Sequence, residues 1–196
     1  MIVRENTGER PSRGFEREPA KRVFAQELRE TRLHFKETDE EKSPGFILLP
    51  TGERANRIFL VGTLTEKERR GEQNMFYHAR IADPTGTFFV IAGSYQPDAM
   101  QQIARIDPPT FVAVSGKPNL YEAPSGAILI SIRAESITAV DVETRNLWIL
   151  DTARNSLQRL DNLGKDPDSQ KALEYYHTDA TKYRKMVYDV LAQLKL

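Results

Sequence analysis

The sequence of 196 residues contains no cysteine. Disulfides, thiolate metal sites and cysteine nucleophiles are therefore excluded. No apolar run approaches the ~20 residues that are needed to span a bilayer, and the N-terminal residues lack the apolar core of a signal peptide. We expect a soluble, intracellular protein that makes no membrane contact.

An excess of charge of either sign is also missing. Lys and Arg together number 28, and Asp and Glu together also number 28, so the formal net charge is zero. A protein that binds nucleic acid alone is usually visibly basic, because it has to neutralise phosphates. The composition argues against a strong stand-alone binder, but it fits a subunit that has a locally basic groove.

Signatures of catalysis and of metal binding are absent as well. His34, His78 and His177 lie in three different segments, without a second ligand at metal spacing. Asp83 stands before Pro-Thr-Gly, where a role in a turn outweighs that of a general base. The sequence contains neither the GxxxxGK(S/T) phosphate loop nor the GxSxG nucleophile elbow. We expect a protein that is not an enzyme and needs no metal or cofactor.

The middle of the chain is rich in short segments of β type. A polar tail at residues 1–18 has no periodicity, and we expect it to be flexible. A short helix and a strand are expected within 20–36, and a charged loop at 66–74. The expected strands are 46–49, 57–65, 75–82, 87–92, 111–116, 127–132 and 136–140, with an amphipathic helix at 96–106.

The order of these elements indicates the fold. The tight-turn sequence at 83–86 joins two of the strands into a hairpin. The order strand, hairpin, short helix, hairpin is that of the OB-fold, a small five-stranded Greek-key barrel that is partly open. We therefore predict an all-β OB-fold barrel with a helix between its third and fourth strands, followed by C-terminal α-helices and preceded by a short disordered tail.

After Val140 the hydrophobic period changes to 3.6 residues. One helix is expected to run to Leu163, a break is expected at 164–167, and a second helix is expected over 168–194. Each has an apolar stripe that requires a partner, either the barrel of the same chain or another subunit. The predicted partner-binding residues are Leu147, Ile149, Leu150, Leu157, Leu173, Tyr176, Tyr183, Val187 and Leu191.

Ligands of an OB-fold bind mainly on the face of strands 2 and 3 and at the loops that join strands 1–2 and 4–5. A single-stranded nucleic acid requires flat aromatic rings for its bases and basic groups for its phosphates. Alternation along the second strand directs Ala79 and Ile81 to the core and Phe76, His78 and Arg80 to the groove.

The third strand and the loops complete this predicted site. Phe88 and Phe89 are adjacent, so one of them belongs to the core; we place Phe88 inside and Phe89 in the groove, although the reverse assignment stays open. The run 67–70 is either a basic flap on the groove or only a solvated loop. The predicted nucleic-acid-binding residues are Phe76, His78, Arg80, Phe89, Tyr95, Lys117, Tyr121 and Arg133.

Three segments of the barrel region stand out as a set, namely LLPTGERANRIFLVGTLTE, ARIADPTGTFFVIAGSYQPDAM and PPTFVAVSGKPNLYE. Together they resemble the archaeal replication protein A-associated OB-fold proteins, the counterparts of the middle subunit of the trimeric single-strand binder. The resemblance extends from Arg17 to Asp141. It implies a subunit that binds single-stranded DNA beside a larger replication protein A-like OB-fold subunit and, in a trimer, a small third subunit.

The same resemblance implies work in DNA replication, recombination and repair, in the cytoplasm and associated with the nucleoid. Such trimers assemble through a helix that follows each OB-fold, which corresponds here to the helix after Val140. The predicted organisation is a flexible tail at 1–18, an OB-fold domain with an N-terminal extension at 19–141, and a helical region for subunit assembly at 142–196.

Two other functions remain open. An OB-fold adaptor that mediates protein assembly with little DNA contact fits the zero net charge and the long C-terminal stripe. An RNA-binding OB protein is the second alternative, because OB-folds also bind RNA.

Overall fold

The computed structural model describes residues 18–36 and 45–194. The tail predicted at 1–18 therefore lies, apart from Glu18, outside the described residues.

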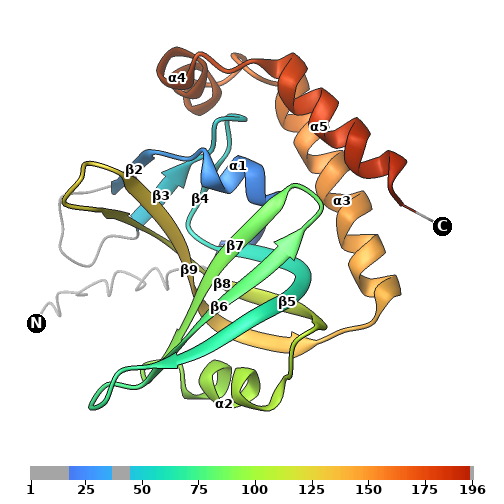
Figure 1. Cartoon of the computed structure of the whole chain (residues 1–196). Helices are drawn as coiled ribbons and strands as arrows, with labels where there is room; N and C mark the ends of the chain where they lie inside the picture. The colour runs from blue at the N-terminus through green and yellow to red at the C-terminus, as the bar shows by residue number, and fades with distance from the viewer. Residues whose placement is uncertain (1–17, 37–44, 195–196) are drawn as a thin grey trace, which may run out of the picture.

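A closed barrel forms the centre of the molecule (Figure 1). Its strands are β5 (Ile58–Arg70), β6 (Phe76–Asp83), β7 (Gly86–Gly93), β8 (Thr110–Glu122) and β9 (Ile128–Ala139). β5, β6 and β7 pair antiparallel in chain order, β9 pairs parallel with β7, and β8 joins β9 back to β5. The helix α2 (Pro97–Arg105) connects β7 to β8. This is the strand order of the OB-fold, and the predicted fold class is confirmed.

Some predicted boundaries were wrong because barrel closure lengthens the strands. The charged segment after residue 65 is strand as far as Arg70, with a register shift between Leu64 and Glu66 where β5 passes from pairing with β8 to pairing with β6. The predicted strands at 127–132 and 136–140 form one continuous strand, β9, which pairs with β8 along a long hairpin. Both extensions arise from pairing with a neighbouring strand, β6 for β5 and β8 for β9, which local sequence does not reveal.

Two glycines lie where a neighbouring strand leaves no room for a side chain. A Cβ on Gly62 would lie 2.5 Å from the carbonyl oxygen of Ala82, and one on Gly116 would lie 2.4 Å from that of Arg133. The prediction that the glycine within the first barrel strand marks a special backbone position is consistent with this packing.

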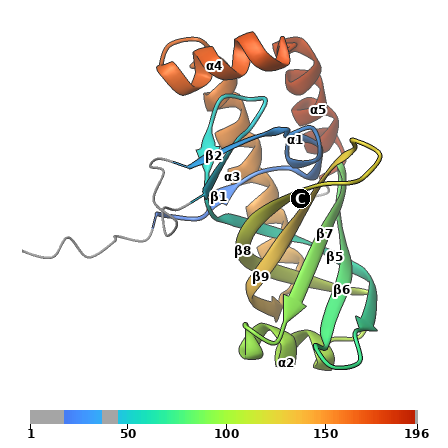
Figure 2. The same cartoon turned by 90° about the vertical axis from the view of Figure 1, so that its left-hand side faces the viewer.

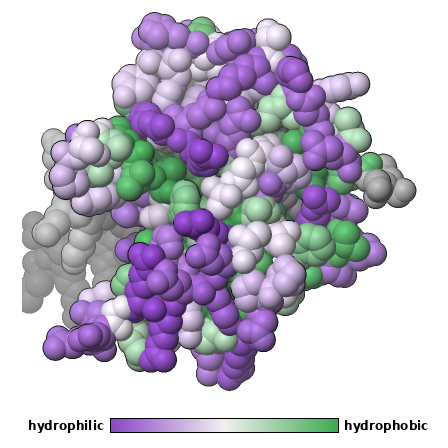
Figure 3. Space-filling model, in the orientation of Figure 1, coloured by the Kyte–Doolittle hydropathy of each residue, from purple (hydrophilic) through white to green (hydrophobic). Residues whose placement is uncertain are grey.

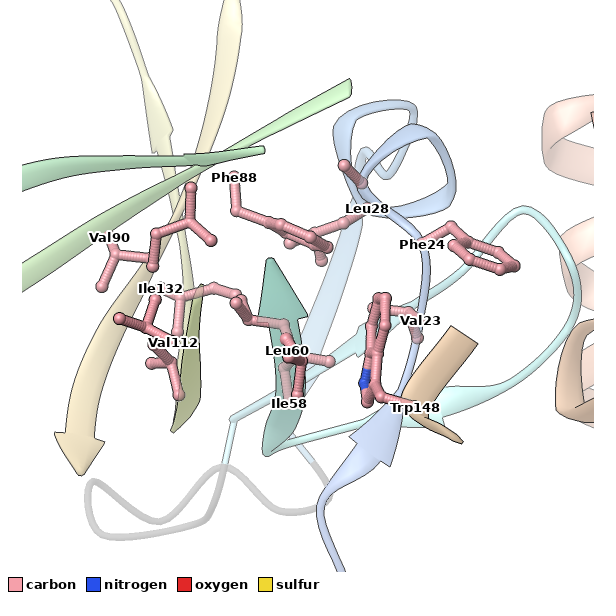
Figure 4. Packing of buried hydrophobic residues seen from close by; sticks show 14 of the residues in the cluster. Val23, Phe24, Leu28, Ile58, Leu60, Phe88, Val90, Val112, Ile132 and Trp148 are labelled. Carbon is pink, nitrogen blue, oxygen red and sulfur yellow. The ribbon is translucent and has the colours of Figure 1, made fainter. Parts of the chain in front are cut away.

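One hydrophobic core joins the barrel to the segments that flank it (Figure 4). Inside the barrel it contains Ile58, Leu60, Phe88, Val90, Val112 and Ile132. It continues to Val23, Phe24 and Leu28 of the N-terminal extension and to Trp148 of the first C-terminal helix. The Phe24 and Trp148 rings meet edge to face at 5.8 Å, and the Trp148 indole donates a hydrogen bond to the carbonyl of Phe59.

The N-terminal extension contributes two short strands and a helix. β1 (Lys21–Arg22) pairs parallel with β5, α1 (Ala25–Arg29) follows, and β2 (Leu33–Lys36) forms a second sheet with β3 (Gly45–Leu48) and β4 (Arg54–Ala55). In Figures 1 and 2, α1 lies at the upper end of the barrel, below the C-terminal helices.

The C-terminal region consists of three helices, α3 (Val142–Asp161), α4 (Pro167–Tyr176) and α5 (Ala180–Ala192). The single helix predicted over 168–194 was wrong. The chain turns at His177, which has a left-handed φ of 49°, and Asp179 then caps α5 by accepting hydrogen bonds from the amides of Thr181 and Lys182. α3 and α5 pack on each other and on the core of the same chain.

Candidate nucleic-acid interface

The outer face of β6 and β7 has the side-chain alternation that the sequence predicts. Phe88, Val90 and Ala92 are buried in the core, whereas Phe89 is 36% exposed on the outside. Of the two adjacent phenylalanines, Phe88 therefore belongs to the core and Phe89 is the outer residue. On β6, Ala79 and Ile81 are buried, Phe76 and His78 are half-buried, and Arg80 is exposed.

A hollow of about 640 Å³ lies on this face. It brings together His78, Phe89 and Tyr121, three of the predicted residues, although they come from three different strands. The β8–β9 hairpin forms one wall, and the segment around α1 forms another. The remaining lining residues are Arg29, Arg32, Ile91, Asn119, Ile128, Leu129, Ile130 and Ser131.

The aromatic groups in and beside the hollow are arranged for stacking. The rings of His78 and Phe89 lie nearly parallel, with centroids 6.1 Å apart and planes 21° apart. The Arg80 guanidinium lies 5.9 Å from the centroid of the Phe89 ring and forms a long contact of 3.4 Å with Glu66. Tyr121 is 56% exposed at the hairpin. Exposed aromatic rings in a groove are what a nucleobase stacks on.

Other predicted residues lie outside the hollow. Phe76 pairs with Gly93 at the far end of β6 and β7, and Tyr95 follows this end at 93% exposure. Lys117 and Arg133 are exposed and directly opposite each other on β8 and β9, and Arg133 is also next to Ile91 in register. The predicted set therefore divides into a central cluster and two outlying pairs.

The basic flap considered for residues 67–70 is not supported. These residues belong to β5. The Lys67 ammonium donates to the carbonyls of Ile103 and Ala104 at the end of α2 and lies 3.3 Å from Asp107. Lys67 therefore stabilises the C-terminal end of a helix.

Sequence reasoning missed Arg29 and Arg32, which line the hollow from outside the barrel. Both precede the first barrel strand by more than twenty residues, and nothing in their local pattern distinguishes them from solvated charges. They reach the hollow because the first turn of α1 is bound to the β6–β7 turn. Asp83 Oδ2 accepts from the Ala25 amide at 2.8 Å, and Thr85 Oγ1 accepts from the Gln26 amide at 3.0 Å.

Asp83 thus acts in the turn, as the sequence predicts. Its other carboxylate oxygen accepts from the Thr85 amide and hydroxyl and from the Gly86 amide. Burial raises the pKa of Asp83 to about 6, and the hydrogen bonds from Ala25, Thr85 and Gly86 oppose this shift only in part. The carboxylate is a structural anchor for α1.

A buried ion pair, also missed from the sequence, fixes α1 from its other side. The Glu27 side chain is fully buried, and its carboxylate lies 2.8 and 3.1 Å from Nη2 of Arg159 on α3. The same carboxylate accepts hydrogen bonds from the Phe24 amide, the Thr51 hydroxyl and the Ser156 hydroxyl. Burial by itself would lower the pKa of Arg159, but Glu27 and Glu53 more than offset this, and the pKa is raised.

Several predicted partner-binding residues are covered by their own chain. Ile149, Tyr183 and Val187 are buried in the common core, and the Tyr176 hydroxyl is bonded to the amides of Arg32 and Leu33 and to the carbonyl of Leu48. The reason is that α3 and α5 use their inner stripes to cover the barrel and the extension.

The rest of that predicted set is more accessible. Leu150, Leu157 and Leu191 are half-buried, Leu173 is exposed, and Leu147 is 64% exposed. Figure 3 shows hydrophobic surface at the right-hand edge of the molecule. Val142 and Leu147, in the first turns of α3, are exposed. Binding of a partner to these residues stays a prediction.

Within residues 18–36 and 45–194, no cluster of three or more His, Asp or Glu side chains is placed to hold a metal ion. None of the helices in this part of the chain is long and apolar enough to cross a membrane.

No protein-family model matches the sequence, and no curated protein matches it significantly. Among solved structures, the second single-stranded DNA-binding protein of Mycobacterium smegmatis is 17% identical, with a TM-score of 0.38 over 45% of this chain and 89% of that one. The mitochondrial single-stranded DNA-binding protein Rim1 of S. cerevisiae is 15% identical, with a TM-score of 0.35 over 43% of this chain and 94% of that one.

The yeast Stn1 and Ten1 structure is 13% identical, with a TM-score of 0.46 over 64% of each chain. These similarities are too distant to indicate what this chain binds. The closer relationship to the archaeal replication protein A-associated proteins stays a prediction.

Proposed function

We propose that this chain binds single-stranded DNA on the outer face of β6 and β7, with no catalytic step. The observation that carries the proposal is the hollow in which Phe89, His78 and Tyr121 converge. Two of these rings already lie nearly parallel, and bases stack on such side chains with about 1–3 kcal/mol each, with little dependence on sequence.

The charges around the hollow support an anionic ligand. Lys117 and Arg133 are exposed cross-strand neighbours, and neither forms an ion pair with a carboxylate among the described residues. Like charges that are directly opposite on adjacent strands destabilise a sheet. A phosphate bound between them would relieve this repulsion, so the neutral chain has a locally basic surface next to its aromatic site.

We also propose that the chain is a subunit of a replication protein A-like complex in DNA replication, recombination and repair. The resemblance over 17–141 and the exposed apolar residues on the outer face of α3 support assembly with a larger OB-fold subunit, and with a small third subunit in a trimer. Because the inner stripes of α3 and α5 are covered in the chain itself, the outer face with Leu147 is the part of α3 available to such a partner.

The test is binding of the purified chain to a fluorescent oligothymidylate of about 16 nucleotides, the upper end of the footprint of one OB-fold. We expect Phe89→Ala with Tyr121→Ala to weaken binding by about tenfold or more, since each stacked base is worth about 1–3 kcal/mol. The matched control is Tyr188→Ala, which removes an exposed aromatic ring from α5. Unchanged affinity in the double variant, with an intact thermal transition, would contradict the proposed site.

The two alternatives give other results in the same assay. An adaptor that makes little contact with DNA shows no affinity at any salt concentration, whereas phosphate contact gives an affinity that falls as salt rises. An RNA-binding protein would release labelled DNA when unlabelled RNA of the same sequence is added at lower concentration than unlabelled DNA.

A further inference from the structure

We propose that Arg29 and Arg32 of the N-terminal extension bind phosphates of the strand that occupies the OB groove. This inference rests on the proposed function and extends it, because it places part of the nucleic-acid site outside the barrel. An OB-fold binds mainly with its strand face and two loops. Here the hollow on that face has a further basic wall, which comes from a segment that precedes the first barrel strand.

The position of Arg29 is set by the β6–β7 turn. A Cβ on Gly86 would lie only 3.1 Å from Nη1 of Arg29, so the arginine side chain extends across this turn in the space that the missing side chain leaves. The same hollow is lined by Phe89, three residues further along β7. A single-stranded DNA that stacks a base on Phe89 therefore has its sugar-phosphate backbone within reach of an arginine at the end of α1.

The two guanidinium groups are available for an anion. Arg29 is exposed and forms no ion pair among the described residues. Arg32 donates through Nη1 to the carbonyls of Arg29 and Thr31, at 2.6 and 2.8 Å. These bonds occupy two carbonyl oxygens that would otherwise repel a phosphate at the end of α1, and they leave the rest of the guanidinium fork for charge-assisted hydrogen bonds.

The basic wall, formed by Arg29 and Arg32, is also held in place before any ligand binds. α1 is only five residues long, and an isolated helix of that length is not stable. Its amides at Ala25 and Gln26 are bonded to the β6–β7 turn, and Glu27 is bonded to Arg159 in the interior. Arg29 is the last residue of α1, and Arg32 follows it, with its amide bonded to the Tyr176 hydroxyl. Arginines on a segment fixed in this way bind a ligand without the entropic cost of ordering that segment.

The experiment measures the salt dependence of oligothymidylate binding for the full chain. For single strands the slope of log affinity against log salt is about 0.7 per neutralised phosphate. We expect Arg29→Ala with Arg32→Ala to reduce the slope by about 1.4, and to weaken binding about 25-fold at 0.1 M salt if the two lines meet at 1 M. The charge-retaining variant Arg29→Lys with Arg32→Lys is expected to keep most of the slope.

The matched control is Arg105→Ala with Arg154→Ala, which removes two exposed arginines from α2 and α3. It has the same net charge as the alanine variant of the wall, so an effect of overall charge would lower both slopes equally and would overturn the inference. Thermal unfolding of each variant shows whether it is folded. If Arg32→Ala is not, Arg29→Ala alone serves, with an expected reduction of about 0.7.

Failure of the inference and failure of the proposed function are distinguishable. If the wall variant keeps the full slope while Phe89→Ala with Tyr121→Ala loses affinity, the groove binds the strand and the arginines do not. If the unaltered chain shows no binding even at low salt, the proposed function fails and the inference fails with it.

Discussion

Replacement of Arg159 by methionine is predicted to be among the most damaging single changes in this chain. The variant keeps an apolar side chain about as long as the arginine stem, but it leaves the carboxylate of Glu27 fully buried without its cation. Removing one partner of a buried ion pair typically costs about 3–5 kcal/mol. For a chain of this size that corresponds to a fall of about 6–20 °C in Tm.

The geometry explains why the cost is far above that of removing a surface arginine. The Arg159 guanidinium binds Glu27, Glu53, Thr51 and Ser156, so its loss removes bonds to α1, to the β3–β4 turn and within α3 at once. Urea unfolding followed by Trp148 fluorescence reports the loss directly, because this tryptophan is buried next to α1.

A double-mutant cycle separates the ion pair from general damage to the core. An apolar pair can replace a buried ion pair at small cost. The loss in the free energy of unfolding for Glu27→Met with Arg159→Met should therefore be smaller, by at least about 2 kcal/mol, than the sum of the losses for the two single variants. The control is Lys185→Met, which breaks the exposed pair with Asp189 and should change stability by less than about 0.5 kcal/mol. Additive single effects, or a cost below 1 kcal/mol for Arg159→Met, would refute the reasoning.

Three further predictions concern other parts of the fold. Because burial raises the pKa of Asp83 to about 6, the folded state holds this proton more tightly than the unfolded state does. Its contribution to stability is therefore fully present below pH 3.8 and is lost as the pH rises through 6. Between pH 7 and pH 5 the protein should therefore gain about 1 kcal/mol relative to Asp83→Asn in urea unfolding. Trp148→Ala should cost about 3–5 kcal/mol, since it removes the ring against Phe24 and a hydrogen bond; a cost near zero would show that the helical region does not share the barrel's core. Gly116→Ala should lower the Tm, because its Cβ would meet a backbone carbonyl at 2.4 Å, whereas Gly126→Ala, which has open space but a φ of +79°, tests the cost of backbone strain alone.

The order of the barrel strands along the chain could be predicted from the sequence because each contains a segment with a period of two. Alternation alone assigned Phe76, His78, Arg80 and Phe89 to the outer face, and the structure agrees. Strand lengths could not be predicted in the same way. Residues 66–70 are all charged, and such residues are poor strand formers in isolation, yet they form strand because each of them pairs with a residue of β6.

What the sequence could not show is contact between distant segments. Glu27 and Arg159 are separated by 132 positions, and neither has a local pattern that sets it apart from the many surface charges. The same is true of Arg29 and Arg32, whose place beside Phe89 depends on how α1 binds a turn more than fifty residues away. The apolar stripe of the C-terminal helices could be recognised in the sequence. Its buried part faces the barrel of the same chain, and periodicity does not indicate which surface covers a stripe.

The site and the helical region depend on each other through α1. Arg159 and Trp148 hold the inner side of α3 against α1, and α1 in turn forms a wall of the hollow that contains Phe89. The residues that line this hollow come from the barrel and the N-terminal extension, and none of them lies on α3. A partner bound at the outer face of α3 would then raise affinity mainly by placing a second binding site on the same strand, where the local concentration of the second site governs the gain. Remodelling of the groove is not needed for such a gain, because the inner face of α3 is already fixed.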